Sequence, residues 1–560
     1  MAQARTVIGE SVEESIGGGE DVAPPRLGPA VGALADVFGH GRAVARHGVS
    51  FGRELAKIAV GRSTVAPAKG DRRFADSAWS ANPAYRRLGQ TYLAATEAVD
   101  GVVDEVGRAI GPRRTAEARF AADILTAALA PTNYLWTNPA ALKEAFDTAG
   151  LSLARGTKHF ASDLIENRGM PSMVQRGAFT VGKDLAVTPG AVISRDEVAE
   201  VLQYTPTTET VRRRPVLVVP PPIGRYYFLD LRPGRSFVEY SVGRGLQTFL
   251  LSWRNPTAEQ GDWDFDTYAG RVIRAIDEVR EITGSDDVNL IGFCAGGIIA
   301  TTVLNHLAAQ GDTRVHSMAY AVTMLDFGDP ALLGAFARPG LIRFAKGRSR
   351  RKGIISARDM GSAFTWMRPN DLVFNYVVNN YLMGRTPPAF DILAWNDDGT
   401  NLPGALHGQF LDIFRDNVLV EPGRLAVLGT PVDLKSITVP TFVSGAIADH
   451  LTAWRNCYRT TQLLGGETEF ALSFSGHIAS LVNPPGNPKA HYWTGGTPGP
   501  DPDAWLENAE RQQGSWWQAW ADWVLARGGE ETAAPDAPGS AQHPALDAAP
   551  GRYVRDLPAG

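Results

Sequence analysis

Apolar and polar residues follow two different spacings along the chain, and the change comes shortly after Pro171. From about residue 31 to residue 165, apolar residues recur every three or four positions, which predicts a series of amphipathic helices. Farther along, short β-branched runs alternate with amphipathic helical stretches, a pattern typical of a mostly parallel sheet with helices on both faces. The chain is therefore predicted to hold a helical N-terminal domain over 31–190 and an α/β domain over 191–527.

The α/β region contains short apolar runs that are candidates for sheet strands. A helix is predicted at 265–282, and a second at 295–309 begins directly after one of these runs. Between about 326 and 434 the alternation of strand and helix fails, and an insertion of this length between core strands is where a cap or lid would lie. The candidate strands are 215–219, 248–253, 287–292, 440–444 and 469–473.

Both ends of the chain differ in composition from the middle. Residues 1–30 are rich in Gly, Glu and Pro and are expected to be disordered, while residues 528–560 are rich in Ala and Pro and are expected to form an extended tail. Several tryptophans between 505 and 523 recur at helical spacing, which favours packing of a terminal helix against the core. The basic run 346–352 could attract phosphate groups, but a solvated cap loop is the simpler interpretation.

The composition excludes several functional classes. The 560 residues carry a net charge of −5, which argues against nucleic-acid binding because phosphate contacts need a basic face. With only two cysteines, no disulfide framework is expected, and a cytoplasmic setting fits. No apolar run approaches the roughly 18 residues of a membrane span, and the start lacks the apolar core of a secretory signal. No metal-ligand cluster or dinucleotide fingerprint occurs, so neither a metal nor a redox cofactor is expected.

The sharpest local motif is Gly-Phe-Cys-Ala-Gly-Gly at 292–297, between a predicted strand and a predicted helix. It matches the nucleophile elbow G-x-S-x-G, with Cys294 in the place of serine. The glycines suit a tight turn in which neighbouring backbone passes closely. Such a turn places the side chain at a helix N-terminus, where N–H groups and the helix dipole favour a thiolate. Cys294 is therefore the predicted nucleophile, whereas Cys457 lies in a helical stretch and is interpreted as a core residue.

A nucleophile of this kind needs a base, and the base needs an acid that orients it. In this fold the chain order is nucleophile, acid, histidine, and Asp449 and His477 each follow a predicted strand in that order. His543 lies in the tail and His491 in a Pro- and Gly-rich loop, so His477 is the best candidate for the base. His450, next to the acid, is interpreted as a neighbour that packs or forms a hydrogen bond.

The elbow also predicts an oxyanion hole. One N–H group usually comes from the residue after the nucleophile, here Ala295. The other comes from the loop after an earlier strand, and the proline-rich segment 220–227 occupies that place. Either Ile223 or Gly224 could donate, and a rigid proline loop without a catalytic role is the alternative.

A cysteine nucleophile also bears on the substrate. When a thiolate accepts an acyl group from a thioester, the product is another thioester, so the exchange is nearly neutral in energy and the acyl group stays activated. Cysteine therefore suits an enzyme that holds an acyl chain for transfer to an alcohol, and it favours acyl-CoA as the donor.

The motif around Cys294 resembles the corresponding box of the polyhydroxyalkanoate (PHA) synthases, the poly(3-hydroxyalkanoate) polymerase family. Other short segments that resemble this family follow in order along residues 70–525. They include 71–74, 131–134, 226–231, 252–256, 395–396, 449–450, 476–478 and 514–517. The chain is thus identified as a member of the class I/II single-subunit type, and its length and N-terminal pattern are closer to class II.

The resemblance implies polymerisation of (R)-3-hydroxyacyl-CoA into polyester with release of CoA, and it carries the family's catalytic triad onto Cys294, Asp449 and His477. It also implies an α/β-hydrolase fold with a cap over the site, a homodimer formed through the cap region, and attachment to the growing polymer granule in the cytoplasm. Trp395 and His450 lie in matching segments and are further candidates for the substrate site. No cofactor is implied beyond the CoA that the substrate carries.

One segment departs from the family pattern. The acid motif reads Ala-Asp-His-Leu-Thr-Ala-Trp over 448–454, where the family commonly has Glu-Asp-His-Ile-Val-Pro-Trp. The acid and its His and Trp neighbours are retained, so the role of Asp449 stands, but the local loop is expected to differ.

Several alternatives stay open at the level of the sequence. A cysteine hydrolase of the same fold, such as a thioesterase or a dienelactone-hydrolase-like enzyme, is the main rival to a polymerase, and a non-catalytic granule scaffold is the second. Asp449 could orient His477 or help to activate the 3-hydroxyl group, and the polymer could grow through covalent or non-covalent intermediates. The preferred acyl-chain length depends on a few methylenes of pocket depth, which the shared motifs do not set.

Overall fold

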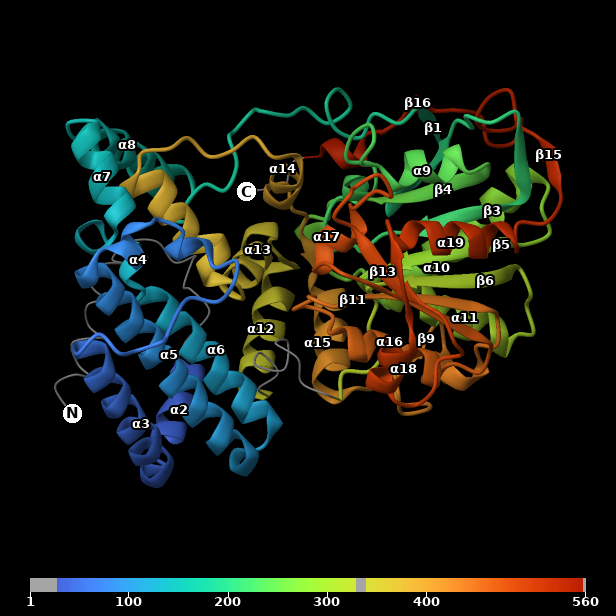
Figure 1. The fold of residues 1–560 in the computed structure, drawn as a ribbon. Coiled ribbons are helices and arrows are strands. Elements are labelled where there is room, and N and C mark those ends of the chain that lie inside the picture. The colour runs from blue at the N-terminus through green and yellow to red at the C-terminus, as the bar shows by residue number, and fades with distance from the viewer. Residues whose placement is uncertain (1–27, 329–338, 557–560) are drawn as a thin grey trace.

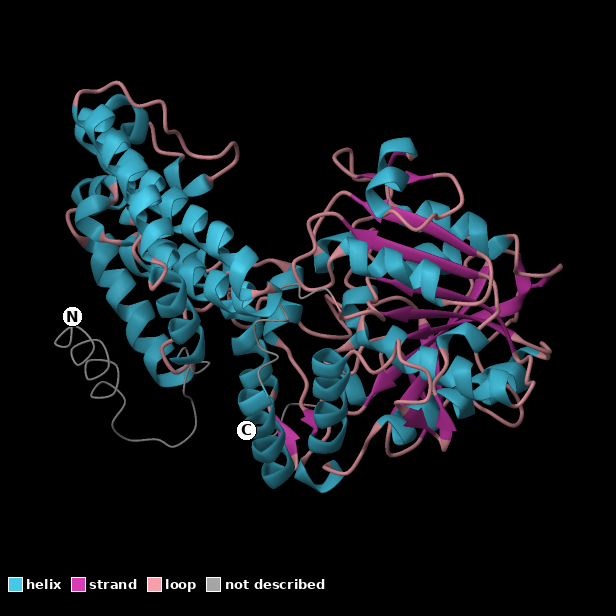
Figure 2. Cartoon of the chain, turned by 90° about the horizontal axis from the view of Figure 1, so that it is seen from below, coloured by secondary structure: helices cyan, strands magenta, loops and turns pink. Residues whose placement is uncertain are grey.

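The protein, seen in a computed structural model that describes residues 28–328 and 339–556, consists of a helical body and a second body built on a sheet (Figure 1). Figure 2 shows from below that the first body is built of helices and loops, while the strands gather on the other side. The disorder predicted for 1–30 lies outside the described residues, except where helix α2 (Gly28–Phe38) begins. No described helix combines the length and the apolar character that crossing a membrane requires.

Asparagine–proline pairs start two helices of the first body. The side chain of Asn82 accepts backbone N–H groups of the first turn of α5 (Pro83–Ile110). Asn138 does the same for α7 (Pro139–Asp147). Proline suits the position after such a cap because its fixed φ matches the helix and it has no N–H to leave unpaired. The other described α-helices of this body are α3 (Gly41–Ala59), α4 (Ala78–Ala81), α6 (Pro112–Ala128) and α8 (Leu151–Glu166).

Within the described residues, the second body rests on a twelve-stranded sheet of order β14-β13-β12-β11-β6-β5-β3-β4-β2-β1-β16, with β15 paired to β3. The neighbours from β12 to β4 run parallel, and the strands outside them are antiparallel. This confirms the predicted mostly parallel α/β fold. The strands are β1 (Gly190–Arg195), β2 (Ala199–Tyr204), β3 (Thr210–Val219), β4 (Leu246–Trp253), β5 (Val288–Phe293), β6 (Val315–Ala321), β11 (Thr441–Ala446), β12 (Thr468–Ser473), β13 (His491–Thr494), β14 (Glu510–Gln513), β15 (Glu531–Ala533) and β16 (Asp547–Ala548).

Helices cover both faces of the sheet, and each face has its own apolar core. One core lies under α10 (Phe265–Thr283), α11 (Ala295–Ala309) and α16 (Trp454–Leu463). The other lies under α9 (Phe237–Gly243) and α19 (Trp516–Leu525). Trp516, Trp517 and Trp520 are each 1% exposed, which confirms that the tryptophan-rich helix packs against the core. Two short helices, α17 (His477–Leu481) and α18 (Pro502–Asn508), follow β12 and β13.

The segment between β6 and β11 forms a largely helical insertion that reaches the first body. Gly156 of α8 touches it so closely that a Cβ there would lie 1.8 Å from the carbonyl oxygen of Tyr381. The basic run 346–352 was predicted to be a loop, which is wrong, because it forms the end of a helix; Lys346 pairs with Asp412 at 2.6 Å. The insertion contains α12 (Pro339–Lys352), α13 (Ala357–Trp366), η8 (Asn370–Phe374), η9 (Val377–Leu382), α14 (Asp391–Asp397), α15 (Gly404–Asp416) and the short strands β7 (Ile354–Ile355), β8 (Leu402–Pro403), β9 (Ala426–Val427) and β10 (Thr430–Pro431).

The C-terminal tail is part of the α/β body. Its short strands β15 and β16 pair with β3 and β1, a pairing that the sequence pattern does not predict. The placement of His491 in a loop is also wrong, since this residue begins β13. Both corrections have the same cause: these strands are only two to four residues long, too short to show an alternating apolar pattern.

Candidate active site

Cys294 lies on a sharp turn between β5 and α11. Its φ and ψ are 49° and −123°, a left-handed conformation that is strained for any residue with a side chain. The turn holds because glycines surround it: a Cβ at Gly292 would lie 2.5 Å from the Cα of Gly297. At Gly296 a Cβ would lie 2.3 Å from the carbonyl oxygen of Val219. The motif 292–297 therefore has the geometry of a nucleophile elbow, with the cysteine at the N-terminus of a helix.

Asp449 and His477 meet beside this turn. Asp449 follows β11 and His477 begins α17 after β12, so both stand at the carboxyl ends of parallel strands. Nδ1 of His477 donates a hydrogen bond to Oδ2 of Asp449 at 2.6 Å, and both side chains are buried. The Oδ1 atom of Asp449 accepts the backbone N–H groups of Leu451 at 2.8 Å and Thr452 at 2.9 Å, which fixes the carboxylate.

His477 interacts electrostatically with both Asp449 and Cys294. Burial lowers the pKa of His477, but attraction to the Asp449 carboxylate and a charge and hydrogen-bond interaction with Cys294 outweigh it and raise the pKa to about 10. Burial raises the pKa of Asp449, but the histidine and its other hydrogen-bond donors bring it below the ordinary value. His477 thus lies between the carboxylate and the thiol, and with Nδ1 bound to the carboxylate its other ring nitrogen is left for the sulfur.

The candidates for the oxyanion hole lie close to the elbow. Ala295 is the first residue of α11 and is 3% exposed. The proline loop 220–227 passes directly beside the elbow, because a Cβ on Gly296 would also lie 2.6 Å from the carbonyl oxygen of Pro220. Ile223 and Gly224 are half-buried in this loop. The structure therefore places the proline loop that holds Ile223 and Gly224 next to the elbow that holds Ala295.

Trp395, from the insertion, packs against the same loop. Its ring lies close enough to Gly224 that a Cβ there would be 3.1 Å from Cζ2. Its Nε1 donates to the backbone oxygen of Arg225 at 2.7 Å, and Gly224 forms an isolated β-bridge with Gly399. Trp395 thus couples the insertion to the loop that flanks the elbow.

His450 does not replace the predicted base. Burial and the positive charge of Arg368 lower its pKa to about 4, although the Asp449 carboxylate opposes them, so it is neutral near pH 7. Cys457 is fully buried, its Sγ donates to the backbone oxygen of Thr452 at 3.6 Å, and burial raises the pKa of its thiol. Among the described residues, neither His450 nor Cys457 has the paired acid and thiol contacts that His477 has.

Two residues of the site were not predicted from the sequence. Thr452 places its hydroxyl between Asp449 and His477. Arg225, 2% exposed, binds Asp398 and the end of the C-terminal tail. The motif 448–454 marks Thr452 only as a departure from a family pattern, and nothing in the sequence links Arg225 to residues more than 300 positions away.

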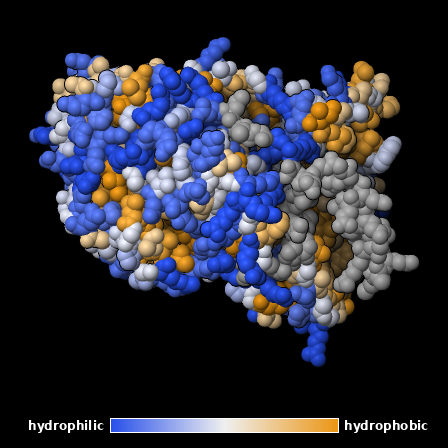
Figure 3. Space-filling model, turned by 180° about the vertical axis from the view of Figure 1, so that it is seen from behind, coloured by the Kyte–Doolittle hydropathy of each residue, from blue (hydrophilic) through white to orange (hydrophobic). Residues whose placement is uncertain are grey.

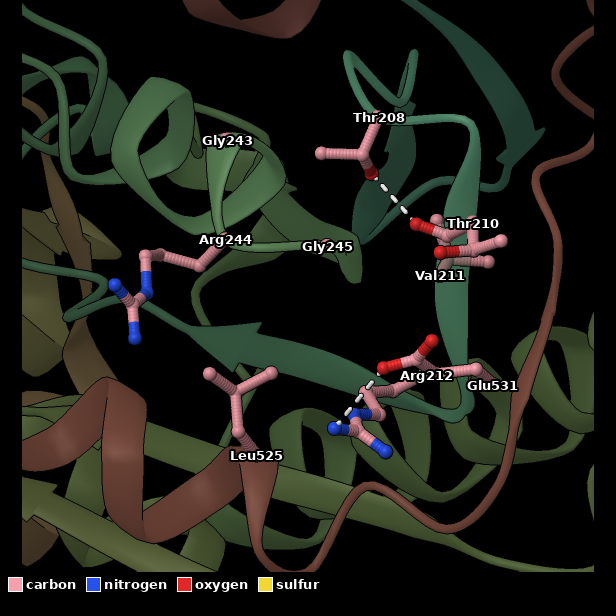
Figure 4. A pocket seen from close by; sticks show the side chains of 9 residues that line it. All are labelled: Thr208, Thr210, Val211, Arg212, Gly243, Arg244, Gly245, Leu525 and Glu531. Carbon is pink, nitrogen blue, oxygen red and sulfur yellow. Dashed lines mark hydrogen bonds and ion pairs between the residues drawn. The ribbon is translucent and has the colours of Figure 1, made fainter.

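A surface pocket of about 310 Å³ lies elsewhere, between the turn that leads into β4 and the tail strand β15 (Figure 4). Arg212 and Glu531 on its wall form an ion pair at 3.3 Å. It lies at the start of β3, whereas the proline loop follows the end of that strand, and none of the candidate residues lines it. The candidate site is therefore defined by converging side chains rather than by this pocket.

Comparisons with known proteins agree with this arrangement. The family model described as "Poly-beta-hydroxybutyrate polymerase (PhaC) N-terminus" matches residues 70–241, and the model of the "alpha/beta hydrolase fold" matches residues 234–484. Two proteins of Ectopseudomonas oleovorans, Poly(3-hydroxyalkanoate) polymerase 1 and 2, are 45% and 44% identical over 513 residues, which is 91% of this chain and 91% of each of them. The Poly(3-hydroxyalkanoate) polymerase subunit PhaC of Cupriavidus necator is 40% identical over 505 residues, 89% of this chain and 85% of that protein.

Proposed function

The chain belongs to the poly(3-hydroxyalkanoate) polymerase family, and we propose that Cys294 holds the acyl chain of its polyester while the next unit is added. As a member of this family it is an acyltransferase that takes (R)-3-hydroxyacyl units from CoA and releases the CoA. The observation that carries the proposal is the position of His477, which lies between a carboxylate and a thiol on a strained elbow.

In the first half of the reaction, the Cys294 thiolate attacks the carbonyl carbon of the acyl-CoA thioester. The carbon–sulfur bond to CoA breaks, and the departing sulfur takes the proton that His477 holds. The acyl group is then bound to Cys294 as a new thioester. N–H groups of Ala295 and of the proline loop would stabilise the oxyanion of the tetrahedral intermediate.

In the second half, the 3-hydroxyl group of another acyl unit attacks the acyl-cysteine. His477 accepts the hydroxyl proton, an ester bond forms, and the Cys294 thiolate leaves. We propose that Asp449 acts by orienting His477 rather than by activating the hydroxyl directly. Both of its oxygens are already occupied, Oδ1 by backbone N–H groups and Oδ2 by His477 and Thr452.

The test is to supply (R)-3-hydroxybutyryl-CoA and to follow both CoA and polymer. Insoluble polyester together with free CoA is expected, whereas soluble hydroxy acid as the only acyl product would identify a hydrolase. Cys294→Ala should abolish both the formation of polyester and the release of CoA. Cys457→Ala is the matched control, because this buried cysteine has no part in the reaction, and it should retain activity. Comparing four-carbon with ten-carbon substrates in the same assay would give the chain-length preference.

An apolar surface on the first body supports attachment to the polymer granule. Trp136, Phe146 and Ile165 are 79%, 87% and 83% exposed. Figure 3, from behind, shows apolar side chains gathered at the corner of the molecule where α7 and α8 lie. Large exposed apolar side chains of this kind mark contact surfaces, and a water-insoluble polyester offers a matching one.

The granule proposal is tested by pelleting the protein with isolated polyester granules. The double variant Phe146→Ser and Ile165→Ser should remain largely in the supernatant. Phe390→Ser is the control, since Phe390 is 59% exposed but lies in the insertion, and it should pellet like the wild type. Equal pelleting of all three proteins would contradict a role for this corner.

The remaining partners are proposed from the family. We expect a homodimer formed through the insertion and a location in the cytoplasm on the granule surface; sedimentation over a range of protein concentrations would measure the first. We also propose that the reaction needs neither a metal ion nor a redox cofactor, because Cys294 supplies the nucleophile and His477 carries out every proton transfer described above. Dialysis against a chelator should leave the rate of CoA release unchanged.

A further inference from the structure

Thr452 places a hydroxyl group inside the buried triad, at the position where the family commonly has valine. Its Oγ1 donates to Oδ2 of Asp449 at 2.7 Å and lies 3.1 Å from Nδ1 of His477. The same Oδ2 accepts Nδ1–H of His477 at 2.6 Å. Thr452, Asp449 and His477 are 6%, 9% and 6% exposed, so water competes little for these bonds.

The two oxygens of Asp449 have different tasks. Oδ1 accepts only backbone N–H groups, of Leu451 and Thr452, and these contacts do not depend on the threonine side chain. The hydroxyl is therefore not needed to hold the carboxylate in place. The hydroxyl instead weakens Oδ2 as an acceptor for Nδ1–H of His477. A donor that binds a carboxylate stabilises its negative charge, and the carboxylate then binds other donors less strongly.

We propose that Thr452 is a positioning residue that weakens the pull of Asp449 on His477, so that the imidazolium can still protonate the departing CoA thiolate. The proposal rests on the polymerase mechanism above, in which CoA leaves with the proton of His477. A carboxylate that holds the imidazolium more tightly makes this proton harder to give away. The second half of the reaction has the opposite need, because there His477 accepts a proton.

The charge balance at His477 supports this role. Burial lowers its pKa, yet Asp449 and Cys294 together raise it to about 10. The Cys294 contribution ends once that sulfur carries the acyl group, whereas the attraction to Asp449 remains, and an ordinary thiol has a pKa near 8.5. Each further increase in basicity would slow the release of CoA, and the hydroxyl of Thr452 opposes such an increase.

The kinetic test compares Thr452→Val, which removes the hydroxyl and keeps the shape, with Thr452→Ser, which keeps the hydroxyl. In rapid-mixing experiments at neutral pH, Thr452→Val should slow the first release of CoA by roughly threefold to tenfold, the change expected for up to one pKa unit. KM should stay the same, and Thr452→Ser should restore the rate. Thr460→Val is the control, since Oγ1 of this buried threonine has no hydrogen-bond partner among the described residues, and its rate should not change.

A second measurement does not depend on catalysis. The Nδ1–H proton of His477 should give a far-downfield proton NMR resonance that disappears in His477→Gln. In Thr452→Val this resonance should move farther downfield, because Oδ2 then accepts no second side-chain donor and binds Nδ1–H more strongly, and in Thr452→Ser it should return. If the wild type releases no CoA, the proposed function fails, but the resonance still tests Thr452. An unchanged resonance and rate in Thr452→Val, or an equal loss of rate in Thr452→Ser or Thr460→Val, would overturn the proposal.

Discussion

Replacing Arg225 by methionine should release the end of the C-terminal tail from the loop beside the elbow. The Arg225 side chain is 2% exposed, and its Nε donates to Oδ1 of Asp398 at 2.7 Å. Its Nη1 donates to the backbone oxygens of Tyr553 at 3.0 Å and Val554 at 2.8 Å, and its Nη2 donates to that of Asp556. One guanidinium group thus connects the proline loop, the insertion and the tail.

The magnitude follows from these contacts. Breaking a buried charge pair by removing one partner costs about 3–5 kcal/mol. Asp398 is 27% exposed on its side chain and can regain water, which places the cost near the lower end. About 3 kcal/mol corresponds to a roughly hundredfold increase in the open population of the tail. Because β15 and the rest of the tail have their own contacts, the loss should be local rather than a general unfolding.

Hydrogen exchange of peptides covering 545–556 measures this opening directly. In Arg225→Met, exchange there should accelerate by roughly a hundredfold, and the rate of CoA release should fall because the proline loop has lost an anchor. Arg213→Met is the control: Arg213 also pairs with the tail, through Glu530 at 2.8 Å, but the two side chains are 50% and 66% exposed. It should leave the exchange of 545–556 unchanged. Wild-type exchange in a folded Arg225→Met variant, or equal acceleration in both variants, would refute the reasoning.

Three further predictions concern the elbow, the pH dependence of stability and the insertion. Gly296→Ala should destabilise the protein by about 3 kcal/mol, because its Cβ would lie 2.3 Å from a backbone oxygen. Gly270→Ala on α10 is the control: its Cβ meets nothing within 4 Å, so the variant should have a slightly higher melting temperature. Thermal unfolding compares the two variants. The pKa of His477 is about 10 in the folded protein, against an ordinary value of 6.5. The protonated histidine therefore contributes its full stabilisation below pH 6.5, and this contribution is lost as the pH rises toward 10. Urea unfolding at several pH values should show this decline in the wild type but not in His477→Gln. Trp395→Phe removes the donor to the Arg225 backbone oxygen at 2.7 Å, which costs about 1 kcal/mol, together with the ring atoms that lie against Gly224. It should raise KM for acyl-CoA more than it lowers kcat, and an unchanged KM would mean that the loop does not need these contacts.

The elements that the sequence predicts well are those with a strong apolar period. The helix expected at 295–309 has these bounds as α11, and the strands β5, β11 and β12 lie within one or two residues of their predicted positions. The strand expected at 215–219 is longer, since β3 begins at Thr210. Its first half is lined with exposed and half-buried arginines, so only the buried half carries an apolar signal.

The candidate site could be assembled from the sequence only where chain order and fold fix it. Cys294, Asp449 and His477 follow in the order that the fold requires, and the structure places each at the carboxyl edge of the sheet. Arg225 and Thr452 gain their roles from contacts that no local pattern encodes. The first meets carbonyl groups more than 300 residues away, and the second acts through a single oxygen whose direction only the folded loop determines.

The choice of sulfur at position 294 places unusual demands on the pair that serves it. His477 must give a proton to a thiolate in one half of the reaction and take one from a hydroxyl group in the other. An ordinary thiol has a pKa near 8.5, whereas a hydroxyl group is a far weaker acid, so a more basic histidine speeds the second half and slows the first. Burial lowers the pKa of His477, but the Asp449 carboxylate raises it in both halves of the reaction, which favours attack by the hydroxyl group. Any group that donates to Asp449 therefore shifts the balance toward CoA release, and Thr452 is the one side chain besides His477 that the described structure places there.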